Sequence, residues 1–334
     1  MPPVSQRASA PWICASLAAL ALLAARPAAA LMAGAPPDSA SARVDANLAS
    51  SPFAGVAAIS INGTLFSGVV IAPRYLLTAG HVAAAGPASA MQVILNPGAT
   101  PWTTTVVAAT PYPSYSFPYD DLAILQLANP VPEGVPIYPM YDGALQTGLV
   151  LVLCGYGESG NGNSGPSVSA SSAIKRSGRN SLDLLTTALD NSGLMSRFFV
   201  YDFDGPNGNG PLGGPTVGNG VETMVAVGDS GGPAFVESGG TLELLGINTF
   251  AASTVANQSP TYTFGNLGGG IVAADPRFAS WLKTTTQGTM PPAPAAVGDS
   301  DGPLPPWSDL LLGCALLAMT LARCAHGARP ESAL

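Results

Sequence analysis

The stretch Gly228-Asp229-Ser230-Gly231-Gly232-Pro233 holds a single serine in a turn crowded with glycine. Glycine allows close backbone approach and conformations closed to other residues, so such a turn can expose the serine hydroxyl. The backbone N–H groups of such a turn can also point at an oxyanion. Because a serine hydroxyl is a weak nucleophile, this interpretation requires a base elsewhere in the chain.

A base and an acid are available upstream. His81, in the stretch LTAGHV, is the one histidine between residues 31 and 290. A carboxylate that could orient its imidazole lies in the stretch DDLAIL, where Asp120 and Asp121 are both candidates. The chain order is therefore histidine, aspartate, serine.

Other interpretations of the serine turn fit less well. A Gly-x-Ser-x-Gly stretch also occurs in α/β-hydrolases, where the histidine follows the serine in the chain. Only His326 follows Ser230, and it lies in the C-terminal tail. Each motif alone also has a structural reading: a turn, a structural histidine, an aspartate that begins a strand. The occurrence of all three in one order favours catalysis.

These motifs resemble those of the chymotrypsin/trypsin-like serine protease family, over roughly residues 31–285. That family carries TA(A/G)H, then D(I/L)A, then GDSGGP. The resemblance implies a His81, Asp121 and Ser230 triad, with Asp121 favoured over Asp120 by the Asp-Leu-Ala alignment. It implies an oxyanion hole made by the N–H groups of Gly228 and Ser230. It also implies a serine endopeptidase that acts on proteins or peptides and needs no metal or cofactor.

The hydrophobic pattern predicts an all-β protein. Short apolar or alternating runs between turn residues favour strands. They are at 56–61, 65–72, 91–95, 106–109, 122–127, 149–154, 198–203, 242–247 and 270–273. One helix is predicted after Asp275, a good N-cap followed by Pro276. The resemblance implies two antiparallel six-stranded β-barrels with a C-terminal helix and the site in the cleft between them.

The ends of the chain differ from this middle. Residues 1–30 read as a signal peptide, with Arg7, an apolar run and the small residues PAAA. We expect a protease domain at 31–287, with one barrel at about 31–140 and the other at about 141–287, and a Pro/Gly linker at 288–308. The short hydrophobic segment 309–334 resembles the sorting tails of Gram-negative secreted proteins. The alternative is a membrane anchor, that is, a transmembrane helix.

Composition limits the partners and the redox chemistry. The net charge is −8, whereas a nucleic-acid-binding protein needs a basic patch, so no nucleic-acid partner is expected. Cys154 is the one cysteine of the predicted domain, so no disulfide can form within residues 31–290, and Cys154 is expected to be a buried small hydrophobe. Val82 stands where most animal relatives carry a bridged cysteine, as in bacterial secreted members. We expect an exported, secreted or envelope-associated bacterial monomer.

The resemblance also suggests a specificity pocket. Its base would be Met224, six residues before Ser230, with Val225 beside it. Its walls would be Thr249, Phe250 and Ala251, with Gly270 opposite. The expected preference is for uncharged, medium-sized apolar residues. Glu222 nearby leaves an acidic pocket as the alternative.

Two further expectations concern activation and function. The predicted signal cut exposes Leu31, and the family resemblance implies that the new amine pairs with Asp229 to order the oxyanion hole; a flexible N-terminus is the alternative. In place of an enzyme, the chain could be a binding or adhesion protein on a protease fold. Residues 157–172 are expected to form a surface loop, and 202–209, which resembles a calcium loop only loosely, a solvated turn.

Overall fold

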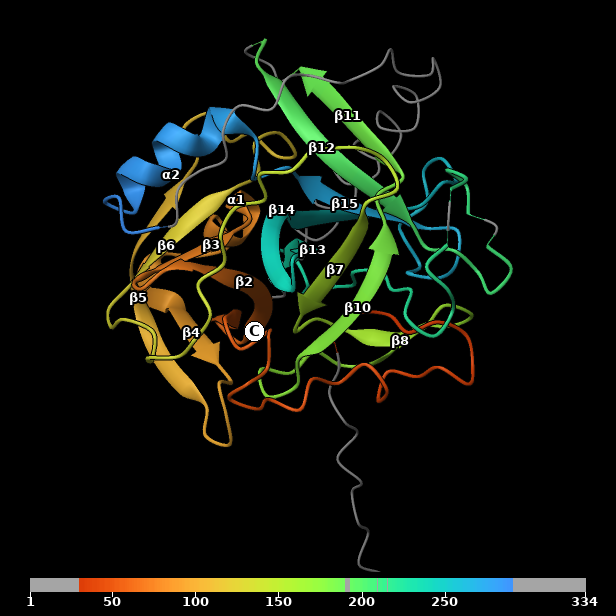
Figure 1. Cartoon of the computed structure of the whole chain (residues 1–334), viewed down its shortest axis with the longest axis horizontal. Helices are drawn as coiled ribbons and strands as arrows, with labels where there is room; N and C mark the ends of the chain where they lie inside the picture. The colour runs from red at the N-terminus through yellow and green to blue at the C-terminus, as the bar shows by residue number, and fades with distance from the viewer. Residues whose placement is uncertain (1–29, 190–192, 209, 215, 291–334) are drawn as a thin grey trace, which may run out of the picture.

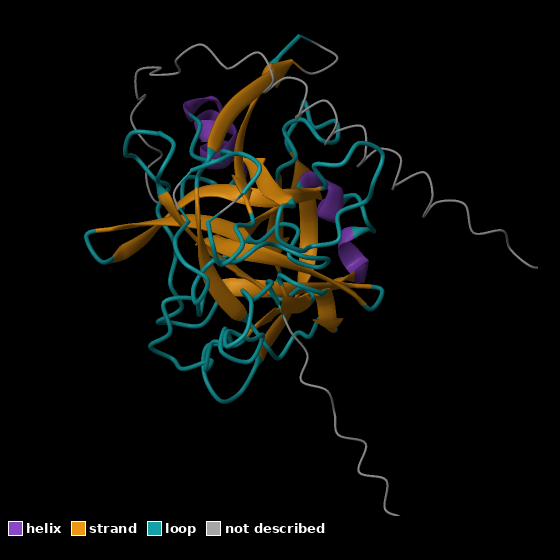
Figure 2. Cartoon of the chain, turned by 90° about the vertical axis from the view of Figure 1, so that its right-hand side faces the viewer, coloured by secondary structure: helices purple, strands orange, loops and turns teal. Residues whose placement is uncertain are grey.

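The computed structural model describes residues 30–189, 193–208, 210–214 and 216–290 (Figure 1). The predicted signal peptide, most of the linker, the C-terminal segment and the cysteines other than Cys154 lie outside these residues. The described part is mostly β-structure, as predicted, with strands at its centre and short helices at its periphery (Figure 2). None of its helices is long and apolar enough to cross a membrane.

The first half closes into a six-stranded antiparallel barrel in the order β1-β2-β3-β6-β5-β4. Its strands are β1 (Val56–Ile61), β2 (Thr64–Ala72), β3 (Tyr75–Thr78), β4 (Met91–Leu95), β5 (Trp102–Pro111) and β6 (Ala123–Leu127). The tight β1–β2 turn uses Asn62 at φ 51° and Gly63 at φ 85°. Positive φ at both positions suits the twist of a two-residue hairpin, which sets the register Ile61 opposite Thr64.

The second half forms a seven-stranded antiparallel sheet in the order β10-β7-β13-β14-β15-β12-β11, where a six-stranded barrel was expected. Its strands are β7 (Val150–Gly155), β10 (Arg176–Ser181), β11 (Leu184–Leu189), β12 (Met195–Asp202), β13 (Pro233–Ser238), β14 (Thr241–Ala252) and β15 (Leu267–Ile271). The predicted runs include none at β3, β10, β11 or β13, and β10 is polar and lacks the apolar pattern of β7.

The predicted C-terminal helix is present. Asp275 accepts a hydrogen bond from the backbone N–H of Arg277 at 3.0 Å and caps the short 3-10 helix η2 (Pro276–Phe278), which leads into α2 (Ala279–Thr285). Phe278 and Leu282 are buried in the large apolar cluster that both halves share, and Phe278 and Trp281 lie edge-on to the ring of Tyr112, which directly follows β5. The helix therefore comes after the second sheet in the chain but packs against the first half.

The N-terminal segment contacts the second half, although it was assigned to the first. Met32 N–H donates to the carbonyl of Met224 at 2.8 Å, and Val44 forms a β-bridge with Arg176. Residues 30–33 have no exposed surface. The boundary near residue 140 still separates the strands of the two halves.

Two local predictions were wrong and one is confirmed. The expected surface loop at 157–172 contains a hairpin of β8 (Ser159–Asn161) and β9 (Gly165–Val168). A solvated turn was expected at 202–209, but the residues at its start are buried: Asp202 is 2% exposed and Asp204 is 5% exposed. Cys154 is free and buried, as predicted, and burial raises the pKa of its thiol.

Candidate active site

His81 and Asp121 form a two-point contact. His81 lies in the short helix α1 (Gly80–Ala83), which follows β3, and Asp121 lies just before β6, the neighbour of β3 in the barrel. One oxygen of Asp121 accepts the backbone N–H of His81 and the other lies against its Nδ1, both at 2.7 Å. The Asp121 side chain is fully buried and that of His81 is 14% exposed. This geometry fixes the ring and leaves its other edge towards the surface.

Asp120, the other candidate, makes different contacts. Its side chain is fully buried and bonds to Ser114, Ser196 and Arg277. The structure therefore brings Asp121, and not Asp120, to the histidine, as the alignment suggested.

The serine turn of the second half packs against the loop that carries His81. A side chain on Gly231, at φ 84°, would begin only 2.0 Å from Thr78 Oγ1 and 3.2 Å from the backbone nitrogen of Ala79. Only glycine allows this approach, so Ser230 lies close to the start of α1. Ser230 is half-buried. No hydrogen bond joins His81 and Ser230 in the described residues, and such bonds often tighten only once substrate is bound.

Ser67 on β2 connects the two halves beneath the serine turn, and sequence reasoning missed it. Its N–H donates to the carbonyl of Ser230 at 2.9 Å, and its hydroxyl donates to the carbonyl of Gly228 at 3.1 Å. Thr78 donates to its carbonyl at 2.8 Å. No sequence signal marks Ser67, because its burial and its partners in the second half come from the fold.

The two predicted oxyanion donors have no partner in the described part of the chain. The N–H groups of Gly228 and Ser230 donate to no other residue there, whereas that of Gly231 donates to Asn248 O at 2.8 Å. Gly228 has φ 94°, and a side chain there would begin 2.8 Å from the Cα of Gly157. The turn thus needs glycine at this position.

The carboxylate of Asp229 is fully buried beneath the turn. It accepts backbone N–H groups from Gly157 at 2.8 Å, Ala226 at 2.9 Å and Leu31 at 3.2 Å. Burial raises its pKa to about 7, and these three hydrogen bonds and the charge of Arg176 oppose that rise. The structure therefore brings the predicted pair of Leu31 and Asp229 together.

The predicted pocket residues lie on β14, on β15 and in the segment before the serine turn, and Met224, Val225 and Phe250 belong to three different apolar clusters. Met224 is fully buried in an apolar cluster with Met32, Phe203 and Ala226, against which Ala251 packs. Val225, Thr249 and Phe250 are buried, and the Thr249 hydroxyl has no hydrogen-bond partner in the described residues. Gly270 on β15 pairs with Asn248 on β14, one residue before Thr249.

Glu222 points into a neighbouring loop. Its carboxylate accepts from Asp204 N at 2.7 Å, Val217 N at 3.0 Å and Thr216 Oγ1 at 2.5 Å. Burial raises the pKa values of Glu222, Asp202 and Asp204. The described residues contain no group of three His, Cys, Asp or Glu placed to hold a metal ion.

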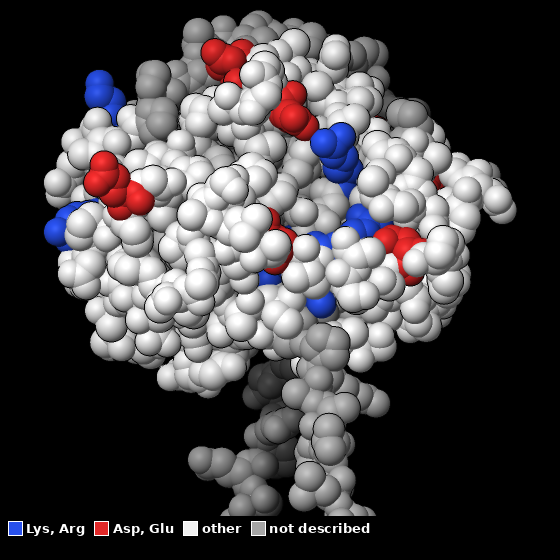
Figure 3. All heavy atoms as spheres, turned by 60° about the horizontal axis from the view of Figure 1, so that its bottom comes forward, with Lys and Arg blue, Asp and Glu red and all other residues white. Residues whose placement is uncertain are grey.

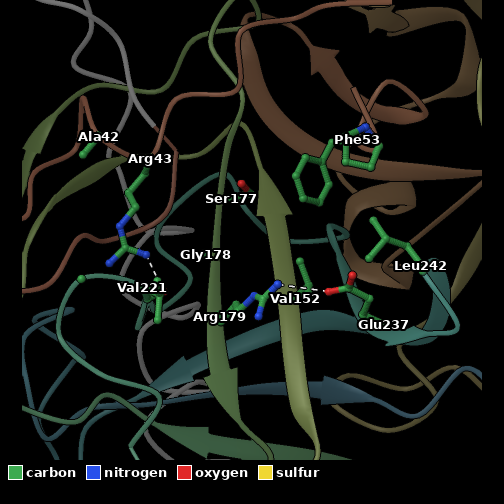
Figure 4. A pocket seen from close by; sticks show the side chains of 13 residues that line it. Ala42, Arg43, Phe53, Val152, Ser177, Gly178, Arg179, Val221, Glu237 and Leu242 are labelled. Atoms are coloured by element: carbon green, nitrogen blue, oxygen red, sulfur yellow. Dashed lines mark hydrogen bonds and ion pairs between the residues drawn. The ribbon is translucent and has the colours of Figure 1, made fainter. Parts of the chain in front are cut away.

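A separate groove of about 540 Å³ lies beside β10 and β7 (Figure 4). Phe53, Val152 and Leu242 line it, and the half-exposed pair Arg179 and Glu237 crosses it with a nitrogen–oxygen distance of 3.1 Å. None of the predicted site residues lines this groove. The face in Figure 3 is largely uncharged, with a few cationic side chains around a hollow.

Comparison with known proteins identifies the family of the chain. The family description "Trypsin-like peptidase domain" matches residues 66–247, just over half of the chain. No curated protein matches it. Among solved structures, neuropsin, a serine protease expressed in the limbic system of mouse brain, is similar at 16% sequence identity, with a TM-score of 0.49. The alignment covers 71% of this chain and 95% of neuropsin. The chain belongs to the family of trypsin-like peptidases.

Proposed function

We propose that this protein is a serine endopeptidase whose triad is His81, Asp121 and Ser230. The observation that carries the proposal is the two-point contact of Asp121 with the backbone and ring of His81, 2.7 Å at each point. A carboxylate held in this way fixes one tautomer of the imidazole and stabilises the imidazolium. The tight packing of Gly231 against Thr78 supports the placement of Ser230 beside that ring.

The reaction follows from these roles. Ser230 Oγ attacks the scissile carbonyl while His81 Nε2 takes its proton, and an acyl-enzyme forms as His81 returns the proton to the leaving amine. The N–H groups of Gly228 and Ser230 stabilise the oxyanion. Water then attacks the acyl-enzyme by the same route in reverse. Every catalytic group in these reaction steps is a residue of the chain.

Replacing triad residues tests this function. We expect Ser230→Ala and His81→Ala each to lower kcat on a proteome-derived peptide library by about 10⁴-fold or more, and Asp121→Asn by somewhat less. Thr254→Ala is the control and should keep full activity, because the exposed Thr254 hydroxyl bonds, among the described residues, to Gly265 O alone. Wild-type turnover in Ser230→Ala would contradict the mechanism.

The pocket favours uncharged side chains. Met224 and Val225 supply no charge at its predicted base, and Glu222 uses its carboxylate on the 204–217 loop. The enzyme therefore cleaves after medium-sized apolar residues, with Ala251 narrowing the entrance against large aromatic ones.

Peptide profiling tests this preference. We expect cleavage after residues such as Ala, Val and Leu, and we expect Met224→Asp to shift the preference towards Lys or Arg because it adds the missing counter-charge. Glu222→Gln should leave the preference unchanged. A wild-type preference for Lys or Arg would overturn the assignment of the pocket.

Activation rests on the Leu31–Asp229 contact. A cut after Ala30 turns the Leu31 nitrogen into an ammonium 3.2 Å from a buried carboxylate. Leu31 has φ 56°, a left-handed conformation that costs an L-residue energy, and the cut removes that restraint. Ala30 and Leu31 have no exposed surface, so the cut precedes insertion of the segment. Signal removal alone then yields active enzyme.

The pH dependence of stability tests this switch. With a short extension before Leu31, Asp229 keeps its raised pKa of about 7, so stability falls as pH rises from about 4 to 7, by about 1.4 kcal/mol per pKa unit. In the form that begins at Leu31, the ammonium lowers that pKa and the loss should shrink. Urea unfolding over this pH range measures both forms. Equal pH profiles together with equal peptidase activity would eliminate the switch.

Export and surface retention complete the proposal, supported by the signal-like start and the short apolar end of the sequence. In a Gram-negative host, we expect mass spectrometry to find the exported chain beginning at Leu31. Deletion of residues 290–334 should release active enzyme from the envelope, because all three proposed triad residues lie before that segment. Intact residues 1–30 on the mature protein, or loss of folding on deletion, would contradict this part.

A further inference from the structure

Asp120 links the loop that carries Asp121 to the second half of the molecule. Its backbone N–H donates to Ser196 Oγ at 3.0 Å, and the same hydroxyl donates back to Asp120 Oδ1 at 2.6 Å. Asp120 and Ser196, which lies on β12, have no exposed surface. Asp120 has φ 50°, a left-handed conformation that aspartate and asparagine tolerate better than most residues.

Arg277 extends this link to the C-terminal helix. Its Nη2 forms an ion pair with Asp120 Oδ1, and its Nη1 donates to the carbonyl of Met195, beside Ser196. Its guanidinium also lies 4.4 Å from the ring centre of Phe278. Burial lowers the pKa of Arg277, which marks the guanidinium as partly removed from water. A fork held at three points has little freedom to follow a displaced Asp120.

The loop that contains Asp120 contacts His81 at two places. Asp121, the next residue, bonds both its ring and its backbone. Phe117 lies edge-on to its ring, with 5.7 Å between ring centres. Ser116 and Tyr119 exchange two backbone hydrogen bonds, at 3.1 and 2.8 Å, so Phe117 to Asp121 form a compact unit. A shift of Asp120 is therefore transmitted to both contacts of the imidazole.

The geometry points to Asp120, Ser196 and Arg277 as positioning residues for the His81–Asp121 pair, an inference that rests on the proposed peptidase function. These three residues, here called the strut, do not belong to the predicted triad, oxyanion hole or specificity pocket. They fix the angle at which the first barrel presents His81 to Ser230 of the second half. Because misplacement by about 1 Å can cost on the order of 10²-fold in rate, the strut should govern kcat and leave KM unchanged.

The test uses Asp120→Asn, Arg277→Gln and their combination. Asparagine keeps the size and left-handed backbone of Asp120 and removes its charge. We expect each single variant to lower kcat by about 10- to 100-fold with KM within about twofold. The double variant should lose no more than the worse single one, because residues that act as a unit are not additive. Arg277→Lys, which keeps the charge without the fork, should recover part of the loss.

The matched control is the half-exposed pair of Arg179 and Glu237. Arg179→Gln and Glu237→Gln should leave kcat within about twofold, since exposed ion pairs contribute little. A kcat within twofold of wild type in both Asp120→Asn and Arg277→Gln would overturn the positioning role and leave the strut a role in stability alone. If either variant fails to fold, Ser196→Ala decides by the same criterion, because it removes one hydroxyl and keeps the ion pair.

A second readout does not need turnover. The proton between His81 Nδ1 and Asp121 should give a far-downfield NMR signal in the wild type that broadens or vanishes in Asp120→Asn and persists in Arg179→Gln. An unchanged signal in Asp120→Asn would overturn the strut. A wild type that hydrolyses no peptide would contradict the proposed function, and this signal would still test the strut separately.

Discussion

The buried carboxylate of Asp229 is the group on which the arrangement of the site depends. It joins three segments by their backbone N–H groups: the N-terminal segment through Leu31, the end of β7 through Gly157, and the serine turn through Ala226. A side chain on Gly155 would begin 2.2 Å from its Oδ1, so the neighbouring strand fits closely around it. Burial without a full counter-charge is costly, which explains why the pKa of Asp229 is raised.

Around this carboxylate, the two halves meet through polar contacts that are fully buried. Ser67 on the first barrel bonds the carbonyls of Gly228 and Ser230 on either side of Asp229. Tyr156 reaches back from the second half to the carbonyl of Val56 and to Asn96. Since no disulfide crosslinks the described residues, these hydrogen bonds and the apolar core hold the halves together. The histidine and serine come from opposite halves, so this junction sets their relation.

Much of this structure could be predicted from local pattern. The apolar runs at β1 and β4 coincide with their predicted bounds, and Asp275 caps the final helix as predicted. Sequence spacing could not show that β10 is a strand, since its residues Arg176–Ser181 are polar and pair through backbone groups alone. Spacing also could not show that residues 30–33 are buried, because that burial depends on distant segments; only the family resemblance pointed to the contact of Leu31 with Asp229.

The residues of the candidate site also fall into two groups, those that the sequence pattern indicated and those that only the fold shows. His81, Asp121 and Ser230 stand in motifs whose residue types suit the proposed chemistry, so pattern was enough to propose them. Asp120 and Asp121 are adjacent, and the Asp-Leu-Ala alignment already favoured Asp121; only the fold shows that Asp120 meets Arg277. Ser67 acts through its place between two halves that are far apart in sequence, which a single sequence does not reveal.

The most direct test of the central claim is covalent labelling of the folded, mature protein with an alkyl fluorophosphonate, followed by peptide mass spectrometry. This probe reacts with a serine only when a base activates its hydroxyl and an oxyanion hole accepts the developing charge. The account predicts one adduct, on Ser230, that is lost in His81→Ala. Folded wild-type protein that forms no adduct at Ser230 would contradict the claim and favour a binding protein on a peptidase fold.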